Sequence, residues 1–153
     1  MHANLYHVTD SLCRLLSVNV WRLTGQEVVV SAVPPEVAEK VKKYGAEKVY
    51  VVDDGQIKGY LVAPKAEALA QLVEKASPAA VLLPSSFENK EAAARLAIKV
   101  ESGLITDAVD VQPGDGGAPV TTQSVFAGNY TVTAKVTRGT PIITVKPNAA
   151  APE

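Results

Sequence analysis

The sequence predicts a three-layer, Rossmann-like α/β fold, with a mostly parallel sheet, helices on both faces and a C-terminal antiparallel meander. Two observations support this prediction. Short β-branched runs alternate with helical patterns at intervals of about 10 to 15 residues, which is typical of parallel strands joined by crossover helices. After Gly103 the helical patterns stop, and strand-like runs follow one another with only turns between them. Right-handed crossovers would place helices on both faces of the sheet.

Four short apolar runs predict the parallel strands, because strands buried on both faces are nearly continuous in hydrophobic residues. They cover residues 3–9, 27–32, 48–53 and 79–83. Four segments between and after them have helical periodicity or helix-start signals. They cover residues 12–23, 34–44, 59–75 and 88–101. Proline suits the first turn of a helix, as at Pro34, and disrupts its interior. We therefore expect Pro64 to break or re-angle the third helix.

The last third of the chain predicts four strands without intervening helices. They cover residues 103–111, 121–126, 129–136 and 142–145. The glycine-rich segment 113–117 is the strongest turn signal, and 127–129 can form a tight reversal because glycine and asparagine tolerate positive φ. We expect these strands to form a meander at the edge of the parallel sheet. Alanine and proline dominate the end of the chain, which predicts a domain over 1–146 and a linker-like tail over 147–153.

The composition narrows the possible partners and compartments. The net charge is −1, from 15 basic and 16 acidic residues, so no basic surface is available for nucleic acid. No apolar run approaches the roughly 20 residues that a membrane-spanning helix needs. The single cysteine, Cys13, fits a reducing compartment. The N-terminus resembles neither a signal peptide nor an organelle presequence. We therefore expect a cytoplasmic protein in a bacterium, or a mitochondrial matrix protein in a eukaryote.

The sequence offers no catalytic or metal-binding constellation. Its two histidines, His2 and His7, lie in the first seven residues, and Cys13 has no histidine nearby that would activate it. Closely spaced glycines would mark a dinucleotide-binding turn after the first strand, but Thr9-Asp10-Ser11 stands there instead. Asp10 suits either a ribose hydroxyl or, in the favoured interpretation, a helix cap. We expect no catalytic, metal-binding or cofactor-binding residues in this chain.

One strand-to-helix junction is nevertheless a candidate ligand site, since open α/β sheets bind ligands at the carboxyl ends of their strands. Its candidate residues are Ser85, Ser86, Asn89 and Lys90. Free N–H groups at the helix start could bind an anion, and Lys90 could add charge. In the alternative, Ser85 or Ser86 caps the helix, and Glu88 and Glu91 complement its dipole. The two acidic residues favour this alternative, because they would repel an anion.

Two further residues are candidates for an interface or a ligand. Arg95, on the helix predicted at 88–101, could pair with Asp107 in a buried or interface ion pair. A solvated arginine is the equally weighted alternative. Asn129, at the predicted reversal, completes the set of candidate interface residues.

The order of motifs in the second half resembles the first domain of the electron transfer flavoprotein alpha subunit. The segments that carry the resemblance are Arg95-Leu96-Ala97, Gly103-Leu104, Thr106-Asp107 and Phe126-Ala127-Gly128-Asn129. Supporting segments are Tyr44-Gly45-Ala46, before a predicted strand, and the closing run from Pro141 to Pro147. The resemblance covers about residues 28–145 and is strongest from Ala79 onward.

The resemblance implies a function that the side chains alone do not. Members of the family shuttle electrons through bound FAD, from acyl-CoA dehydrogenases of fatty acid β-oxidation to a membrane quinone reductase. In the family a second domain binds the FAD, and no residue of this chain matches its flavin-binding motifs. The first domain packs against the beta subunit in a heterodimer and forms part of the base beneath the flavin domain. The implied role is scaffolding and subunit association, not enzymatic catalysis.

Three alternatives remain from the residues themselves. A stand-alone adenine-nucleotide-binding domain would bind its ligand near Asp10 and Ser85. A small hydrolase would need a nucleophile and a base, which the sequence does not supply. An interaction module would form a homodimer through an exposed edge strand, because unpaired edges recruit other strands.

Overall fold

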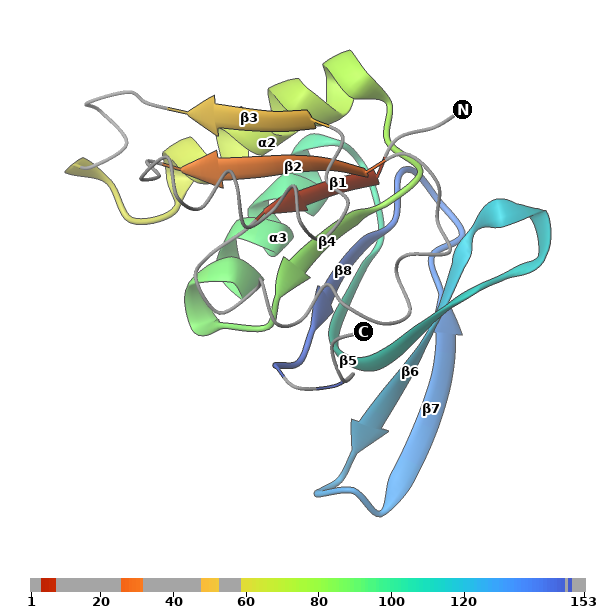
Figure 1. The fold of residues 1–153 in the computed structure, drawn as a ribbon. Coiled ribbons are helices and arrows are strands. Elements are labelled where there is room, and N and C mark those ends of the chain that lie inside the picture. The colour runs from red at the N-terminus through yellow and green to blue at the C-terminus, as the bar shows by residue number, and fades with distance from the viewer. Residues whose placement is uncertain (1–3, 8–25, 32–47, 53–58, 148, 150–153) are drawn as a thin grey trace.

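The computed structural model describes residues 4–7, 26–31, 48–52, 59–147 and 149, and these form one mixed β-sheet with helices. The strands are β1 (Asn4–His7), β2 (Gln26–Ser31), β3 (Lys48–Val52), β4 (Val81–Pro84), β5 (Leu104–Pro113), β6 (Pro119–Val125), β7 (Tyr130–Lys135) and β8 (Ile142–Val145). The described helices are α2 (Ala63–Ala76), α3 (Phe87–Lys99) and the short 3₁₀ helix η4 (Asp115–Gly117). The strand order is β3-β2-β1-β4-β8-β5-β6-β7 (Figure 1). The predicted α/β class is confirmed.

The sheet is parallel from β3 to β5 and antiparallel from β5 to β7. The predicted mostly parallel sheet is therefore correct in part, because the sheet as a whole is mixed. The expected position of the last strand is wrong: β8 does not extend the meander but lies between β4 and β5, parallel to both. Its composition explains why, since Ile142 and Ile143 are fully buried, and only an interior strand is covered on both faces.

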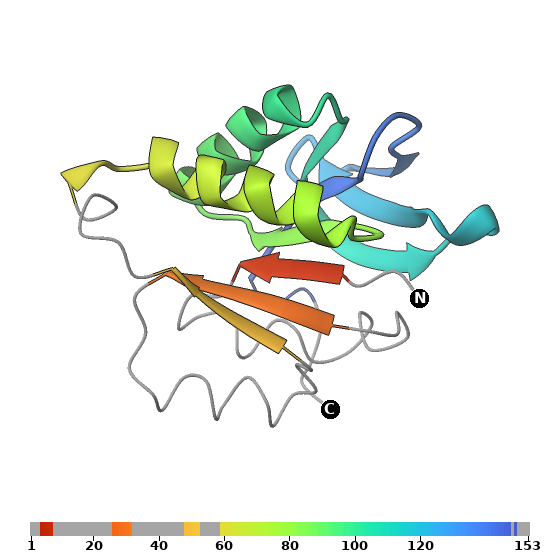
Figure 2. The same cartoon turned by 90° about the horizontal axis from the view of Figure 1, so that it is seen from above.

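Helices α2 and α3 lie side by side on one face of the sheet, as Figure 2 shows. The expectation that Pro64 interrupts a helix is wrong. The helix begins at Ala63, so that Pro64 occupies its first turn, where a missing N–H group costs nothing. It ends at Ser77, which adopts the left-handed conformation with φ 45°. None of the described helices is both long and apolar enough to cross a membrane.

Two predicted helices, at 12–23 and 34–44, lie outside the described residues. The described helices therefore cover one face, and helices on both faces remain a prediction. The predicted boundary between a domain over 1–146 and a tail over 147–153 also remains a prediction.

The core lies between α2, α3 and the centre of the sheet. Its largest fully buried side chains include Leu69 of α2, Leu83 of β4, Leu96 of α3 and Ile142 of β8. Burying each such side chain contributes on the order of 1.5–3 kcal/mol. Because α3 contacts β4, β5 and β8, this core fixes the position of α3 on the sheet, and α3 begins directly after the carboxyl end of β4.

Candidate functional site

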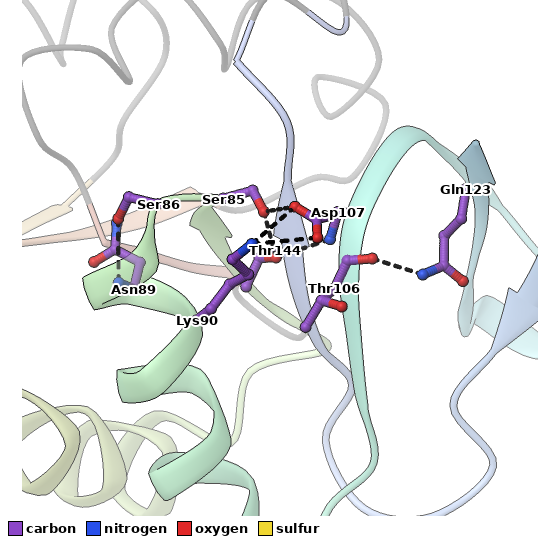
Figure 3. Close-up of polar contacts among 8 residues, drawn as sticks. All are labelled: Ser85, Ser86, Asn89, Lys90, Thr106, Asp107, Gln123 and Thr144. Carbon is purple, nitrogen blue, oxygen red and sulfur yellow. Dashed lines mark hydrogen bonds and ion pairs between the residues drawn. The ribbon is translucent and has the colours of Figure 1, made fainter. Parts of the chain in front are cut away.

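A cluster of polar side chains lies where β4 and β8 end and α3 begins, beside an irregular position within β5 (Figure 3). Ser85 directly follows β4, Thr144 belongs to β8, and Asp107 belongs to β5. Lys90 reaches the cluster from the first turns of α3. The structure thus brings together Ser85 and Lys90, two of the predicted site residues, with Asp107 and Thr144.

A backbone irregularity in β5 positions Asp107 at the centre of this cluster. Asp107 adopts the left-handed conformation with φ 57°, at a shift in the β5–β8 register between Ile105 and Ala108. The backbone N–H of Asp107 donates to Thr144 Oγ1 at 3.0 Å. Gln123 supports the same irregularity from β6, because its Nε2 donates to the carbonyl oxygen of Thr106 at 2.6 Å. Asp107 is therefore held from both neighbouring strands.

The Asp107 carboxylate accepts hydrogen bonds from two directions. The Ser85 hydroxyl donates to Oδ1, and Ser85 Oγ also lies 3.0 Å from Thr144 Oγ1. Lys90 Nζ lies 3.5 Å from Oδ1 and 3.4 Å from Oδ2. The Ser85 hydrogen bond is the main cause that lowers the pKa of Asp107, and Lys90 lowers it further, against the opposing effect of burial. The carboxylate is therefore ionised at neutral pH.

Ser86 forms the N-cap of α3. Its extended backbone has φ −99° and ψ 163°, and its Oγ accepts the backbone N–H of Asn89 at 3.1 Å. Glu88 lies in the first turn, where a carboxylate complements the helix dipole. The helix-capping alternative is confirmed for Ser86, while Ser85 bonds to Asp107 instead. Asn89 is buried, with 4% of its surface exposed.

Of the two alternatives for Arg95, the ion pair with Asp107 is wrong. Arg95 extends along the exposed side of α3 and pairs with Glu91, with Nη2 2.8 Å from Oε1. Residues four apart on a helix are neighbours, so Glu91 is the nearer partner for Arg95. Asp107 instead pairs with Lys90, which lies at the end of α3 that faces the cluster.

Asn129 lies in the turn between β6 and β7, far along the sheet from this cluster. Its Nδ2 donates to the carbonyl oxygen of Phe126 at 2.8 Å, which stabilises its own turn. Phe126 and Ala127 have φ 52° and 56°, and Gly128 has φ 89°. The predicted reversal at 127–129 is confirmed and begins one residue earlier, at Phe126.

The cluster is suited to joining strand ends and not to acid–base chemistry. The cluster itself, formed by Ser85, Lys90, Asp107 and Thr144, contains no histidine that could act as a base toward the Ser85 hydroxyl. Asp107 is a weak base because its pKa is lowered and its oxygens already accept bonds. No group of three or more potential metal ligands occurs among the described residues. Asp10, interpreted as a helix cap or, in the alternative, as a contact to a ribose hydroxyl, lies outside the described residues.

Sequence reasoning missed Thr144 and Gln123. Thr144 is fully buried and was assigned only to a strand. A lone hydroxyl within the apolar run Ile142–Val145 was the available signal, because a buried hydroxyl needs a hydrogen-bond partner. Gln123 gave no comparable signal, because its partner is a carbonyl of another strand.

Comparisons with known proteins bear on this arrangement. A family model described as "Electron transfer flavoprotein domain" matches residues 21–153. The chain is similar to the electron transfer flavoprotein subunit alpha of Mycobacterium tuberculosis, with 40% identity over 128 residues, covering 82% of this chain and 39% of the relative. The electron transfer flavoprotein subunit alpha of Mycobacterium leprae is 41% identical over 109 residues, covering 71% of this chain and 33% of the relative.

A further relative has a different name. The chain is 29% identical over 94 residues to a protein of Acetobacterium woodii named "Lactate dehydrogenase (NAD(+),ferredoxin) subunit LctC", covering 61% of this chain and 22% of the relative. The chain therefore spans about two fifths or less of the length of these curated relatives.

Proposed function

Because this chain belongs to the electron transfer flavoprotein domain family, we propose that it is the N-terminal scaffold and subunit-association domain of an electron transfer flavoprotein alpha subunit. The family match is the observation that carries this proposal. It covers most of the chain, and it agrees with the resemblance carried by the segments from Arg95 to Asn129. The relatives' name, subunit alpha, implies a partner subunit in a complex.

A scaffold role accords with the chemistry of the polar cluster. Ser85, Asp107 and Thr144 bond to one another across three strands, which stabilises the sheet at the start of α3. The mycobacterial relatives are named as components of an electron carrier rather than as enzymes. This chain is, on the same reasoning, a component of an electron carrier rather than an enzyme.

The described residues do not fit an FAD pyrophosphate. The start of α3 is the described helix terminus nearest the carboxyl ends of the strands, but the Ser86 hydroxyl already accepts one of its N–H groups. Glu88 and Asp107 add negative charge at the same place, which disfavours a bound diphosphate. In our proposal, FAD binds to a second domain of the complete protein, and this chain contributes none of the contacts.

The partners of the complete carrier follow from the same proposal. The companion is an electron transfer flavoprotein beta subunit, with which the alpha subunit forms a heterodimer. Acyl-CoA dehydrogenases supply the electrons and a membrane quinone reductase receives them, in the cytoplasm of a bacterium or in the mitochondrial matrix. The Acetobacterium relative is instead named as a subunit of a lactate dehydrogenase (NAD(+),ferredoxin).

Ligand titration distinguishes this function from its alternatives. The purified chain is titrated with FAD and, separately, with AMP, and binding is followed by calorimetry and by the visible absorbance of oxidised flavin. We expect no saturable binding of either ligand up to about millimolar concentration, where a Kd would correspond to only about −4 kcal/mol. Stoichiometric FAD binding would contradict the placement of the cofactor, and AMP binding would favour the nucleotide-binding alternative.

A further inference from the structure

In the hairpin formed by β6 and β7, strand β7 is exposed along nearly all of its length, while β6 is partly buried. From its geometry, we propose that this hairpin, residues 119–135, is the surface that the companion subunit covers. The partner would contribute an uncharged strand or apolar surface that lies along β7 and over one face of the hairpin. This inference rests on the proposed function, because it names the surface through which the subunits associate.

The first argument is exposure. Strand β7 is the last strand in the sheet order, so its outer edge has no neighbouring strand among the described residues. Its residues are exposed along both faces except for Ala134, which is half-buried. Figure 1 shows the hairpin extending away from α2, α3 and the parallel part of the sheet. An extended pair of strands without a covering layer lacks the burial that normally stabilises a sheet.

The second argument is the apolar character of one face. Tyr130 and Val132 alternate along β7 and share a face with Val125 of β6, which lies opposite Tyr130. Phe126 packs edge-to-face on Tyr130, with ring centroids 5.8 Å apart. Yet 78% of Phe126, 65% of Tyr130 and 40% of Val132 remain exposed. Aromatic side chains of this kind are enriched at protein interfaces.

The third argument is charge. Residues 116–134 contain no lysine, arginine, aspartate, glutamate or histidine, although charged residues make up 20% of the whole chain. Depletion of charge marks the buried core of an interface, whereas solvated edge strands are usually protected by charges, proline or bulges. The β6–β7 pairing has no register shift between the pairs Val120–Lys135 and Val125–Tyr130. Strand β7 therefore has no bulge, and it has no proline or charged residue before Lys135. The hairpin is therefore suited to an uncharged partner.

The available area favours a companion subunit over a second copy of this chain. A six-residue strand is about 20 Å long, so pairing two copies of β7 edge to edge would cover roughly 200 Å² of each. A stable interface needs about 800 Å² on each partner. Symmetric edge pairing would also leave Phe126 and Tyr130 exposed on the face. A different chain can cover the edge and the face together, which brings the area closer to the required value.

The test uses the full chain co-expressed with an electron transfer flavoprotein beta subunit. The variant is Val132→Lys, which places a charge at the centre of β7, where a free edge strand tolerates it. The matched control is Ile98→Lys, which replaces another exposed aliphatic residue (80% exposed) on α3. Circular dichroism and thermal unfolding establish that both variants fold. We expect the Kd of the Val132→Lys complex to rise about tenfold or more, with Ile98→Lys within about twofold of the unmodified chain.

Amide hydrogen exchange in the complex provides the second measurement. Peptides that cover 130–135 should exchange more slowly with the partner present, while peptides from α3 should not change. Unaltered affinity of Val132→Lys together with unprotected 130–135 would overturn this inference and leave the proposed function intact. Absence of a complex with the unmodified chain would instead contradict the proposed function. A homodimer that Val132→Lys dissociates would show that a second copy, not a companion subunit, occupies the hairpin.

Discussion

Replacement of Asp107 separates the two roles that this residue has in the sheet. Its side chain accepts the Ser85 hydrogen bond and faces Lys90, while its backbone adopts φ 57°. Asparagine keeps an acceptor for Ser85 and tolerates this φ, but it removes the charge. Alanine removes the acceptor and is strained at positive φ, and glycine removes the acceptor without the strain. The three variants therefore give a defined order of stability.

The magnitudes follow from the geometry. With 39% of the Asp107 side chain exposed, solvent screens the Lys90 pair, so its loss costs a few tenths of a kcal/mol. Weakening the Ser85 bond brings the cost of Asp107→Asn to about 1 kcal/mol. Asp107→Ala loses that bond entirely and adds about 1 kcal/mol of backbone strain, for a total of about 2–3 kcal/mol. Asp107→Gly should recover about 1 kcal/mol of that total.

Urea unfolding measures these differences, and their pH dependence has a defined sign. The pKa of Asp107 is lowered in the folded chain, so its stabilising contribution is complete above the unfolded value of about 3.9. That contribution is lost as the pH falls through the folded value. The free-energy gap between the unmodified chain and Asp107→Asn should therefore narrow below about pH 4. The same change at Asp115, which is exposed in η4, is the control and should leave stability nearly unchanged.

Two outcomes would refute this reasoning. Equal stability of the alanine and asparagine variants would mean that neither a side-chain acceptor for Ser85 nor tolerance of positive φ at position 107 contributes to stability. A glycine variant less stable than the alanine variant would mean that Asp107 does not adopt positive φ in solution.

Two further predictions test the core and the turns. Leu96→Ala should lower the free energy of unfolding by about 2–5 kcal/mol, because Leu96 is fully buried. Ile98→Ala, at an exposed position two residues away, should change it by no more than about 0.5 kcal/mol. Equal effects of the two changes in urea unfolding would mean that α3 does not bury the face that contains Leu96. Gly139→Ala should be more destabilising than Gly116→Ala by at least about 1 kcal/mol, although both glycines have positive φ. Of the two positions, only at Gly139 would the added Cβ meet backbone, 2.9 Å from the Cα of Ser102. Similar melting temperatures of the two variants would contradict the close approach of Gly139 to Ser102.

Local sequence signals were sufficient for the elements that depend on near neighbours. The helix predicted at 88–101 corresponds to α3, because its apolar positions lie within the segment and its cap, Ser86, lies two residues before it. The turn predicted at 113–117 contains η4, where Gly116 has φ 75°. In both cases the residues that determine the conformation are adjacent in the chain.

Signals that depend on distant residues were not sufficient. The pattern of Ile142–Val145 indicates a buried strand, but it does not show which strands flank it. The backbone of Asp107 is held by Thr144, which lies 37 residues away in the chain. The neighbouring Thr106 carbonyl, in the same irregular part of β5, is held by Gln123 of another strand. The sequence left a pair between Arg95 and Asp107 as one of two alternatives, while Lys90 is the cation that α3 directs toward the cluster.

The central claim is that this domain is a scaffold for a companion subunit. The most direct test is the molar mass of the purified chain mixed with the electron transfer flavoprotein beta subunit, determined by size-exclusion chromatography with light scattering. We expect one species whose mass is the sum of the two chains, including the 16.1 kDa of this one, without flavin absorbance contributed by this chain. Two separate peaks with the masses of the individual chains, at concentrations well above micromolar, would contradict it.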